Sequence, residues 1–396
     1  MKKHLFIFIM CFVSFFAKAQ TPKLYINFVS HNEENYTYMS APLTFIAVRP
    51  KIIQMAQLAT TKGAKWHLGS DHIMLRAVLA YDTGTLTAST GGFNVLKYIS
   101  TTYSTAVECD PHAHESLYNN ADVAKLHDSC GVPPGKVMSG FLYNGLASGH
   151  DWQDYQVPNN GDIFPSYNWA PEILWGAATP GHTMDPHYNG IWKPESMTNF
   201  LTHKASNHLI NYGQGCKYEF HDTTSVTRLM KEIRKLTNAI QSGSAPSTGF
   251  YCTSIFFRES YLNTPGFIST SLDDLMDSIN VLVTANKVEW QFIPDVVNKW
   301  KTVYAAKSFI MDCDFTIVNG INEQKINTSG FSFYPNPTND VINFKEEIYD
   351  AEVINLSGQI VIAKIKSTKS IDIKGLENGI YFIRSREVSL KFIVQH

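Results

Sequence analysis

The chain has 396 residues, with 33 Lys or Arg against 35 Asp or Glu and a formal net charge of −2. This balance excludes a polybasic nucleic-acid binder, which needs clustered positive charge to displace counterions from phosphates. With 44% hydrophobic and 17% charged residues, the chain can form a large core and is too poor in charge to be disordered.

The N-terminus has the pattern of a secretory signal peptide. A basic head at residues 1–4 precedes an apolar run at 5–16 and the small-x-small segment Ala17-Lys18-Ala19. The run is shorter than the roughly 20 residues that span a bilayer, and no later run is long enough, so we expect no transmembrane segment. We expect residues 1–19 to be removed. Five cysteines then remain, which predicts at least one disulfide of undetermined connectivity.

Residues 20–318 alternate short apolar runs with amphipathic stretches, in the order expected of β/α units. Strands are predicted at 24–29, 66–68, 106–109, 137–142, 173–176, 208–211, 251–257 and 289–292, and the clearest helices at 45–60, 73–81, 121–126, 224–241 and 272–286. Seven or eight strands, each followed by a helix, predict an α/β fold with a parallel β/α barrel. No Gly-x-Gly-x-x-Gly follows the first strand, which argues against dinucleotide binding.

Two histidines follow the third predicted strand. The segment reads Asp110-Pro111-His112-Ala113-His114-Glu115. His112 and His114 are two residues apart, so on an extended segment they project to the same side and can hold one divalent ion, most simply zinc. Asp110 can orient an imidazole or accept a proton. The alternative is that these are surface histidines in a polar loop.

A second cluster, Ser30-His31-Asn32-Glu33-Glu34, follows the first strand. In a parallel barrel the carboxyl ends of the strands meet at one mouth, so this cluster can supply further ligands or the general base. The alternative is that Asn32 and Glu33 cap the following turn. The sequence thus predicts a metal site with four candidate ligands, His31, Glu33, His112 and His114.

The two clusters together resemble the polysaccharide deacetylase group of the glycoside hydrolase/deacetylase β/α-barrel superfamily. The segments 118–124 and 131–134 also look like the helix and turn that follow the metal histidines there. Family members usually show paired aspartates after the first strand and histidines four apart after the third, where this chain has Asn32-Glu33 and His112-x-His114. The resemblance implies that Glu33 takes the metal carboxylate place and that His112 and His114 take the imidazole places.

The Asp-x-His-x-His run also looks like the motif of amidohydrolase and metal-dependent phosphoesterase barrels. In those families it follows the first strand, whereas here it follows the third, so this second resemblance is the weaker one.

The stretch 149–204 is rich in tryptophan and histidine. Indole faces stack on sugar rings, so Trp152 and Trp192 are candidates for binding a glycan. Lys193 is a candidate for stabilising an oxyanion, and His182 for protonating a leaving group. The alternative is that the aromatic side chains pack long loops.

The C-terminal part of the chain has a different character. A polar linker at 319–330 leads into 331–396, where short alternating strands are separated by turn signals such as Ser357-Gly358 and Asn378-Gly379. This pattern predicts a small all-β sandwich.

Four motifs in this segment carry a further resemblance: Tyr334-Pro335-Asn336-Pro337, Asn355-Leu356-Ser357-Gly358-Gln359, the run 376–382 and Lys391-Phe392-Ile393-Val394. In type and order they resemble the type A sorting domain of the type IX secretion system. The resemblance implies passage through the periplasm, recognition by the secretion machinery, and release or attachment at the cell surface.

The sequence therefore favours a secreted or cell-surface metal-dependent hydrolase of an extracellular glycan, with Asp110 or Glu33 accepting the proton and His182 donating one. One alternative is a metal-independent glycosidase that uses two carboxylates. Its candidates are Glu33, Glu34, Glu172, Glu259 and Glu289. Another is a non-catalytic glycan-binding barrel.

Overall fold

The structure is a computed structural model. It describes residues 22–32, 37–113, 117–141, 152–176, 188–214, 220, 222–246, 248–312, 333–355, 359–385 and 389–396. The chain divides into two compact units, residues 1–320 and 321–396. The predicted signal peptide at 1–19 lies outside the described residues.

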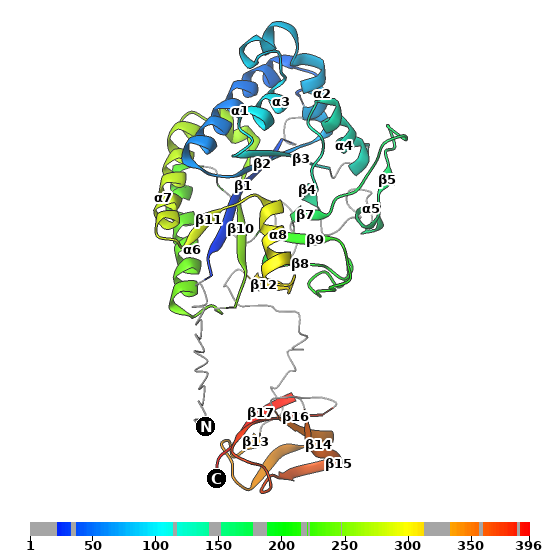
Figure 1. The fold of residues 1–396 in the computed structure, drawn as a ribbon, viewed down its shortest axis with the longest axis vertical. Helices are drawn as coiled ribbons and strands as arrows, with labels where there is room; N and C mark the ends of the chain where they lie inside the picture. Colours follow the sequence, from blue (N-terminus) through cyan, green and yellow to red (C-terminus); the bar gives the residue numbers. More distant parts are fainter. Residues whose placement is uncertain are drawn as a thin grey trace, which may run out of the picture. The chain divides into compact units, whose positions relative to one another are not determined.

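The first unit contains a five-stranded parallel sheet (Figure 1). Its order is β10-β1-β2-β3, and β11 pairs with the first three residues of β1. The strands are β1 (Leu24–Asn32), β2 (Trp66–Ser70), β3 (Val107–Pro111), β10 (Tyr251–Arg258) and β11 (Val288–Trp290). Every residue of β1 is buried, as expected for a central parallel strand.

A second five-stranded sheet has the order β12-β8-β9-β7-β4. Its strands are β4 (Val137–Phe141), β7 (Ile173–Gly176), β8 (Tyr188–Trp192), β9 (Ile210–Gln214) and β12 (Phe309–Asp312). β4, β7 and β9 are parallel, whereas β8 runs antiparallel to both β9 and β12. A short hairpin joins β5 (Asn159–Asn160) to β6 (Asn168–Trp169).

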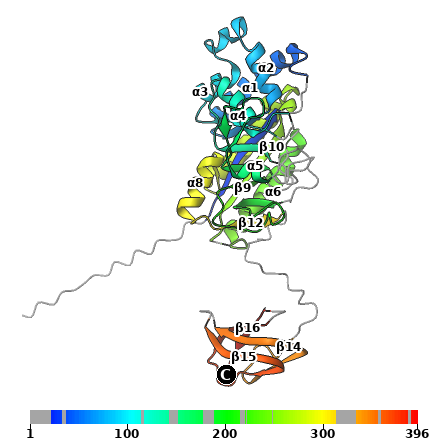
Figure 2. The ribbon, with the colours of Figure 1, turned by 90° about the vertical axis from the view of Figure 1, so that its right-hand side faces the viewer.

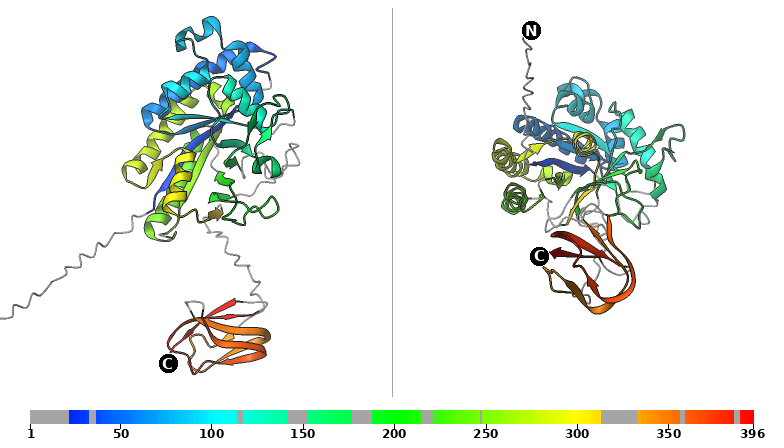
Figure 3. Two further views of the ribbon diagram at one scale, coloured as in Figure 1. Left: turned by 45° about the vertical axis from the view of Figure 1, so that its right-hand side comes forward. Right: turned by 60° about the horizontal axis from the view of Figure 1, so that its bottom comes forward.

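Most of the helices lie around the first sheet (Figures 2 and 3). Two of them begin at side-chain caps that the sequence makes recognisable: Asp71 accepts from the Met74 N–H, and Asn119 forms a capping box with Asp122. The helices are α1 (Pro42–Lys62), α2 (His72–Tyr81), η1 (Gly84–Thr90), α3 (Val95–Thr102), α4 (Asn120–Ser129), α5 (Trp152–Gln156), α6 (Thr223–Ser242), η3 (Glu259–Asn263), η4 (Phe267–Leu272), α7 (Asp273–Thr284) and α8 (Ile293–Val303). None of the helices in the described ranges is long and apolar enough to cross a membrane.

The α/β class is confirmed, whereas a single closed barrel of seven or eight strands is not. An isolated parallel bridge between His112 and Ser139 links the end of β3 to β4. Two side-chain hydrogen bonds also connect the sheets, from Tyr212 Oη to the Thr253 carbonyl at 3.4 Å and from Thr253 Oγ1 to Asn189 Oδ1 at 2.8 Å. Sequence periodicity identifies the strands but does not show how they are distributed between two sheets.

Three cysteines of the first unit, Cys109, Cys130 and Cys252, are buried free thiols. Burial raises the pKa of the Cys130 thiol to about 12, which keeps it protonated and unreactive. The predicted disulfide therefore involves none of these three residues. Cys216 and Cys313 lie outside the described residues.

The second unit is all-β, as expected, and has a core of its own that includes Ile342, Val353, Ile383 and Phe392. Its described strands form one antiparallel sheet in which the long β14 pairs with β13, β15 and β16. The strands are β13 (Phe333–Tyr334), β14 (Val341–Asn355), β15 (Ile360–Asp372), β16 (Gly379–Arg384) and β17 (Ser389–Val394).

Candidate functional site

Two of the predicted ligands, His31 and His112, meet at the carboxyl ends of β1 and β3. Their ring centres are 4.0 Å apart with the planes inclined at 51°, and both side chains are buried. Gly69 of β2 lies between the two strands. A Cβ atom at Gly69 would stand 2.1 Å from Ser139 Oγ and 3.2 Å from His31 Cδ2. The absence of a side chain at Gly69 therefore allows this close packing.

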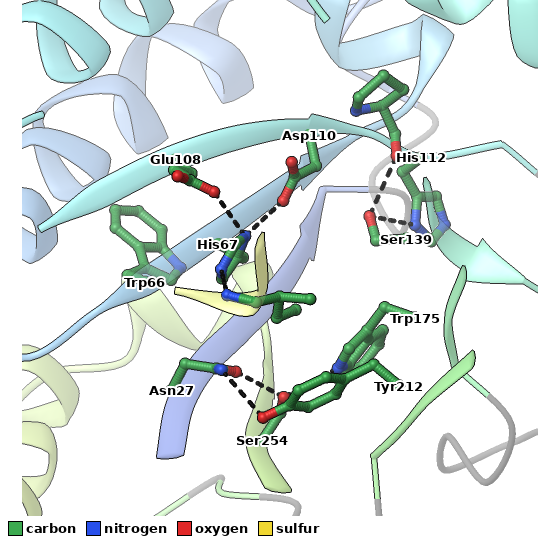
Figure 4. Close-up of polar contacts among 12 residues, drawn as sticks. Asn27, Trp66, His67, Glu108, Asp110, His112, Ser139, Trp175, Tyr212 and Ser254 are labelled. Atoms are coloured by element: carbon green, nitrogen blue, oxygen red, sulfur yellow. Dashed lines mark hydrogen bonds and ion pairs between the residues drawn. The ribbon is translucent and has the colours of Figure 1, made fainter. Parts of the chain in front are cut away.

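Aromatic rings form the walls around His31. Trp175 of β7 and Phe256 of β10 each lie with their ring centres 5.0 Å from the centre of the imidazole. Two hydrogen bonds fix the indole of Trp175: its Nε1 donates to Ser254 Oγ at 2.9 Å, and Ser254 Oγ donates to Asn27 Oδ1 at 2.6 Å (Figure 4). The surroundings of His31 are thus apolar and ordered by a chain of buried hydrogen bonds.

Ser139 and Gly140 of β4 hold His112 from the other side. Ser139 Oγ lies 3.4 Å from His112 Nδ1 and donates to the Pro111 carbonyl at 3.3 Å. Gly140 has φ +88°, and a Cβ atom there would be 2.3 Å from His112 Cε1. Ser139 is not among the site residues predicted from the sequence. The sequence feature that could have indicated it is a serine followed by a glycine near the end of the predicted strand at 137–142.

Asp110 contacts His67 of β2. His67 Nδ1 lies 2.6 Å from Asp110 Oδ2, and the Ile293 N–H at the start of α8 donates to His67 Nε2 at 2.9 Å (Figure 4). Because Nε2 accepts, Nδ1 carries the ring proton and donates it to Asp110. Burial lowers the pKa of His67 and the Asp110 carboxylate raises it, with a net increase. The Ile293 bond by contrast requires the neutral ring.

Together with Glu108, these two residues form a group that has the residue types of a metal site. One ligand atom from each of His67, Glu108 and Asp110 lies within 4.8 Å of the others. Burial raises the pKa of Glu108 to about 7. The ring tautomer leaves no lone pair on His67 Nδ1, the atom that faces the two carboxylates. The arrangement therefore fits a hydrogen-bonded cluster better than a metal centre.

The structure brings His31 and His112 together, whereas Glu33, His114 and His182 lie outside the described residues and stay predictions. The two tryptophans predicted to bind a glycan differ in burial. Trp192 is fully buried in β8 and its Nε1 donates to the Phe200 carbonyl at 2.7 Å, so its face is not available to a sugar. Trp152 is only partly buried, with its ring centre 6.3 Å from that of Phe200, and its role in glycan binding stays a prediction.

Lys193 also lies away from the histidines. It follows β8, which runs antiparallel to β9, so it lies near the amino ends of the parallel strands. Its Nζ donates to the Ala205 carbonyl at 3.1 Å. Burial, and then the charge of Lys301, lower its pKa. This position does not support the predicted role of Lys193 in stabilising an oxyanion at the carboxyl ends of the parallel strands.

Residues 332–395 match the family model described as "Secretion system C-terminal sorting domain". This segment is the sorting domain of the type IX secretion system, and it implies secretion or a cell-surface location. A comparison with curated proteins gives no match.

Among solved structures, the chain is similar to two proteins that carry the description polysaccharide deacetylase as a provisional assignment. The protein from Mycobacterium smegmatis is 10% identical with a TM-score of 0.42, over 72% of this chain and 92% of that one. The protein from Pseudomonas aeruginosa PAO1 is 10% identical with a TM-score of 0.44, over 71% and 92%. A 4-alpha-glucanotransferase from Thermococcus litoralis is 9% identical with a TM-score of 0.39, over 70% and 40%. These values describe a distant similarity only.

Proposed function

We propose that the first unit is an exported metal-dependent hydrolase that acts on an extracellular glycan, and that its metal centre is built on His31 and His112. The observation that carries this proposal is the 4.0 Å separation of the two ring centres at the carboxyl ends of β1 and β3. Neutral imidazole is a preferred ligand of zinc, and catalytic zinc sites use three protein ligands with one position open. Glu33 and His114, which lie two residues beyond His31 and His112 in the sequence, supply the remaining candidates.

The residues around the pair fit such an ion. Gly69 and Gly140 allow the rings to pack closely against the backbone, and Ser139 contacts Nδ1 of His112, as partners that orient metal-bound imidazoles do. Trp175 and Phe256 exclude water from one side. A bound divalent ion would polarise the substrate carbonyl and lower the pKa of a bound water to about 7.

Among the acids, Glu33 is the better candidate for accepting a proton. Asp110 is buried and its Oδ2 already accepts a hydrogen bond from His67, so this oxygen is committed within the fold. His182 remains the candidate for protonating the leaving group.

We also propose that the two sheets together form one distorted seven-stranded barrel, in the order β1-β2-β3-β4-β7-β9-β10. The bridge between His112 and Ser139 supports closure on one side, and the hydrogen bonds of Thr253 and Tyr212 support it on the other. In such a barrel reactive groups belong at the carboxyl ends of the strands, where His31 and His112 lie.

One observation favours a non-catalytic glycan-binding barrel as the second candidate. Asn32 stands where the deacetylase resemblance calls for the first of two acids. Its amide is buried, and neither of its polar atoms has a hydrogen-bond partner among the described residues. A neutral amide cannot act as the base that a carboxylate would supply.

A two-carboxylate glycosidase has less support. Glu172 is bound by Lys136 and Lys301 next to the amino end of β7, and Glu289 by Lys23 and Lys299 in β11. Glu259 lies instead at the carboxyl end of β10. These described carboxylates therefore do not form a facing pair at one strand end.

Metal content tests the proposal. The full exported chain, purified with zinc in the medium, should contain about one zinc per chain. His31→Ala and His112→Ala should each lose it, whereas His208→Ala, at an exposed histidine, should retain it. Release of acetate from acetylated oligosaccharides should follow metal content and stop on chelation. A metal-free parent, or full metal content in both histidine variants, would contradict the proposal.

A further inference from the structure

Arg76 is a partly buried cation that has no acidic partner among the residues that the structure describes. It lies on α2, and its guanidinium carbon is 5.7 Å from the centre of the Tyr118 ring. Among the described residues it has no other ion pair or hydrogen bond. By contrast, the guanidinium of Arg49 is paired with Asp82 at 2.6 Å. A partly desolvated guanidinium without a carboxylate is suited to bind an anion from outside the chain.

The start of α2 lies beside His112. The His112 N–H donates to the Ser70 carbonyl at 3.0 Å, and the next residue, Asp71, caps α2 through the Met74 N–H at 2.7 Å. Side chains in a helix lean toward its N-terminus, so Arg76 is directed toward this end of the helix.

Tyr118 fixes the guanidinium at this position. Its ring stacks on His72 with the centres 4.4 Å apart and the planes inclined at 17°. His72 and Arg76 are four residues apart on one face of α2, so the phenol contacts both. Tyr118 belongs to the segment that joins His112 to α4. The stacked arrangement thus holds the planar fork of Arg76 beside the segment that follows β3.

We infer that Arg76 recognises an acidic sugar residue, through a carboxylate or a sulfate ester, in the glycan that binds at this mouth. The inference rests on the proposed function, because it names the class of glycan that the same site takes. The net charge of −2 gives no general attraction to acidic polymers, so recognition has to come from a local cation. A guanidinium binds both groups through two parallel hydrogen bonds.

Binding to two matched pairs of oligosaccharides tests this inference. The first pair is oligogalacturonate and its methyl ester, which differ in the carboxylate charge. The second is sulfated carrageenan oligosaccharide and neutral agaro-oligosaccharide, which differ chiefly in the sulfate esters. Calorimetry with the full chain should show, in at least one pair, that the acidic member binds about tenfold more tightly or better.

The variants separate recognition from folding. Arg76→Gln should abolish the preference for the acidic member while the affinity for the neutral member and the metal content stay unchanged. Arg76→Lys should keep part of the preference, because it retains charge without the fork. Arg234→Gln, at an exposed arginine of α6, should behave as the parent.

The inference is overturned if the parent binds neither acidic oligomer better than its neutral partner, or if Arg76→Gln keeps the full preference. Metal content and acetate release, measured on the same samples, decide the proposed function separately. A chain that binds zinc without preferring acidic sugars therefore refutes this inference alone.

Discussion

His67 donates its Nδ1 proton to Asp110 at 2.6 Å and accepts the first N–H of α8, from Ile293, at 2.9 Å. One buried imidazole therefore ties β2, β3 and α8 together. Phe292, the N-cap residue of α8, makes no side-chain hydrogen bond to the helix N-terminus. His67 supplies the missing acceptor. Asp110 consequently serves the fold, although it is only two residues from His112.

Removing this acceptor should destabilise the unit. His67→Phe leaves both the Asp110 carboxylate and the Ile293 N–H without their partner, so we expect a loss of about 2–4 kcal/mol in the free energy of unfolding. His208→Phe, at an exposed position, should change it by less than about 0.5 kcal/mol. Denaturant titration measures both. Equal stability of the two variants would contradict this role of His67.

Glu108 should make the unit less stable as the pH rises. Its pKa is raised, chiefly by burial, from 4.5 to about 7. The folded state therefore holds a proton that the unfolded state has lost, so the stabilising contribution is full below pH 4.5 and is lost as the pH rises through 7. Glu108→Gln should thus exceed the parent in stability at pH 8, by about 1 kcal/mol because the side chain is partly exposed, and match it at pH 4.

Glu172→Gln provides the control of opposite sign. Burial raises the pKa of Glu172, but hydrogen bonds from Lys136 and Lys301 lower it by more, so that the net shift is a decrease. Its contribution to stability is therefore present above pH 4.5 and lost as the pH falls through the lowered value. This variant should be less stable than the parent at pH 8. If both variants shift in the same direction at pH 8, the assignment for Glu108 is wrong.

Gly140→Ala should displace His112. Its Cβ would be 2.3 Å from the imidazole, on a backbone with φ +88°. Gly91→Ala is the matched control, because Gly91 has φ +65° with no atom within 4 Å of the added Cβ. We expect the control to lose about 1 kcal/mol in the free energy of unfolding. Gly140→Ala should lose about 3 kcal/mol and should no longer bind zinc. An equal loss in the two variants would mean that only backbone strain is involved.

The ion pair between Arg49 and Asp82 should contribute strongly to the free energy of unfolding, because it joins α1 to the ends of α2 and α3. It is buried, with Nε and Oδ1 2.6 Å apart, and Asp82 also accepts the Val95 N–H at the start of α3. Arg49→Met leaves a buried carboxylate unpaired, which should lower the free energy of unfolding by about 3–5 kcal/mol. Lys62→Met, which removes more exposed pairs with Asp273 and Asp277, should cost less than about 1 kcal/mol. Thermal unfolding of both variants provides the comparison.

The sequence predicts local structure and strand-end chemistry better than it predicts the sheet arrangement. The apolar run at 24–29 and the Asp71 and Asn119 caps carry short-range signals, and β1, α2 and α4 form there. The proximity of His31 and His112 can be predicted, because the carboxyl ends of parallel strands lie at the same edge of a sheet. The direction of β8 depends on its pairing with β9 and β12, which periodicity does not encode. The positions of Trp192 and Lys193 could not be predicted for that reason, nor could the contact of Asp110 with His67, which lies 43 residues away.

X-ray absorption at the zinc edge tests the central claim most directly. On the zinc-loaded full chain, the spectrum should show at least two imidazole nitrogens at about 2.0–2.1 Å from the metal. His31→Ala should lose one of them, and His208→Ala none. A chain that takes up no zinc, or a spectrum of oxygen ligands alone that is unchanged in His31→Ala, would contradict a metal centre built on His31 and His112.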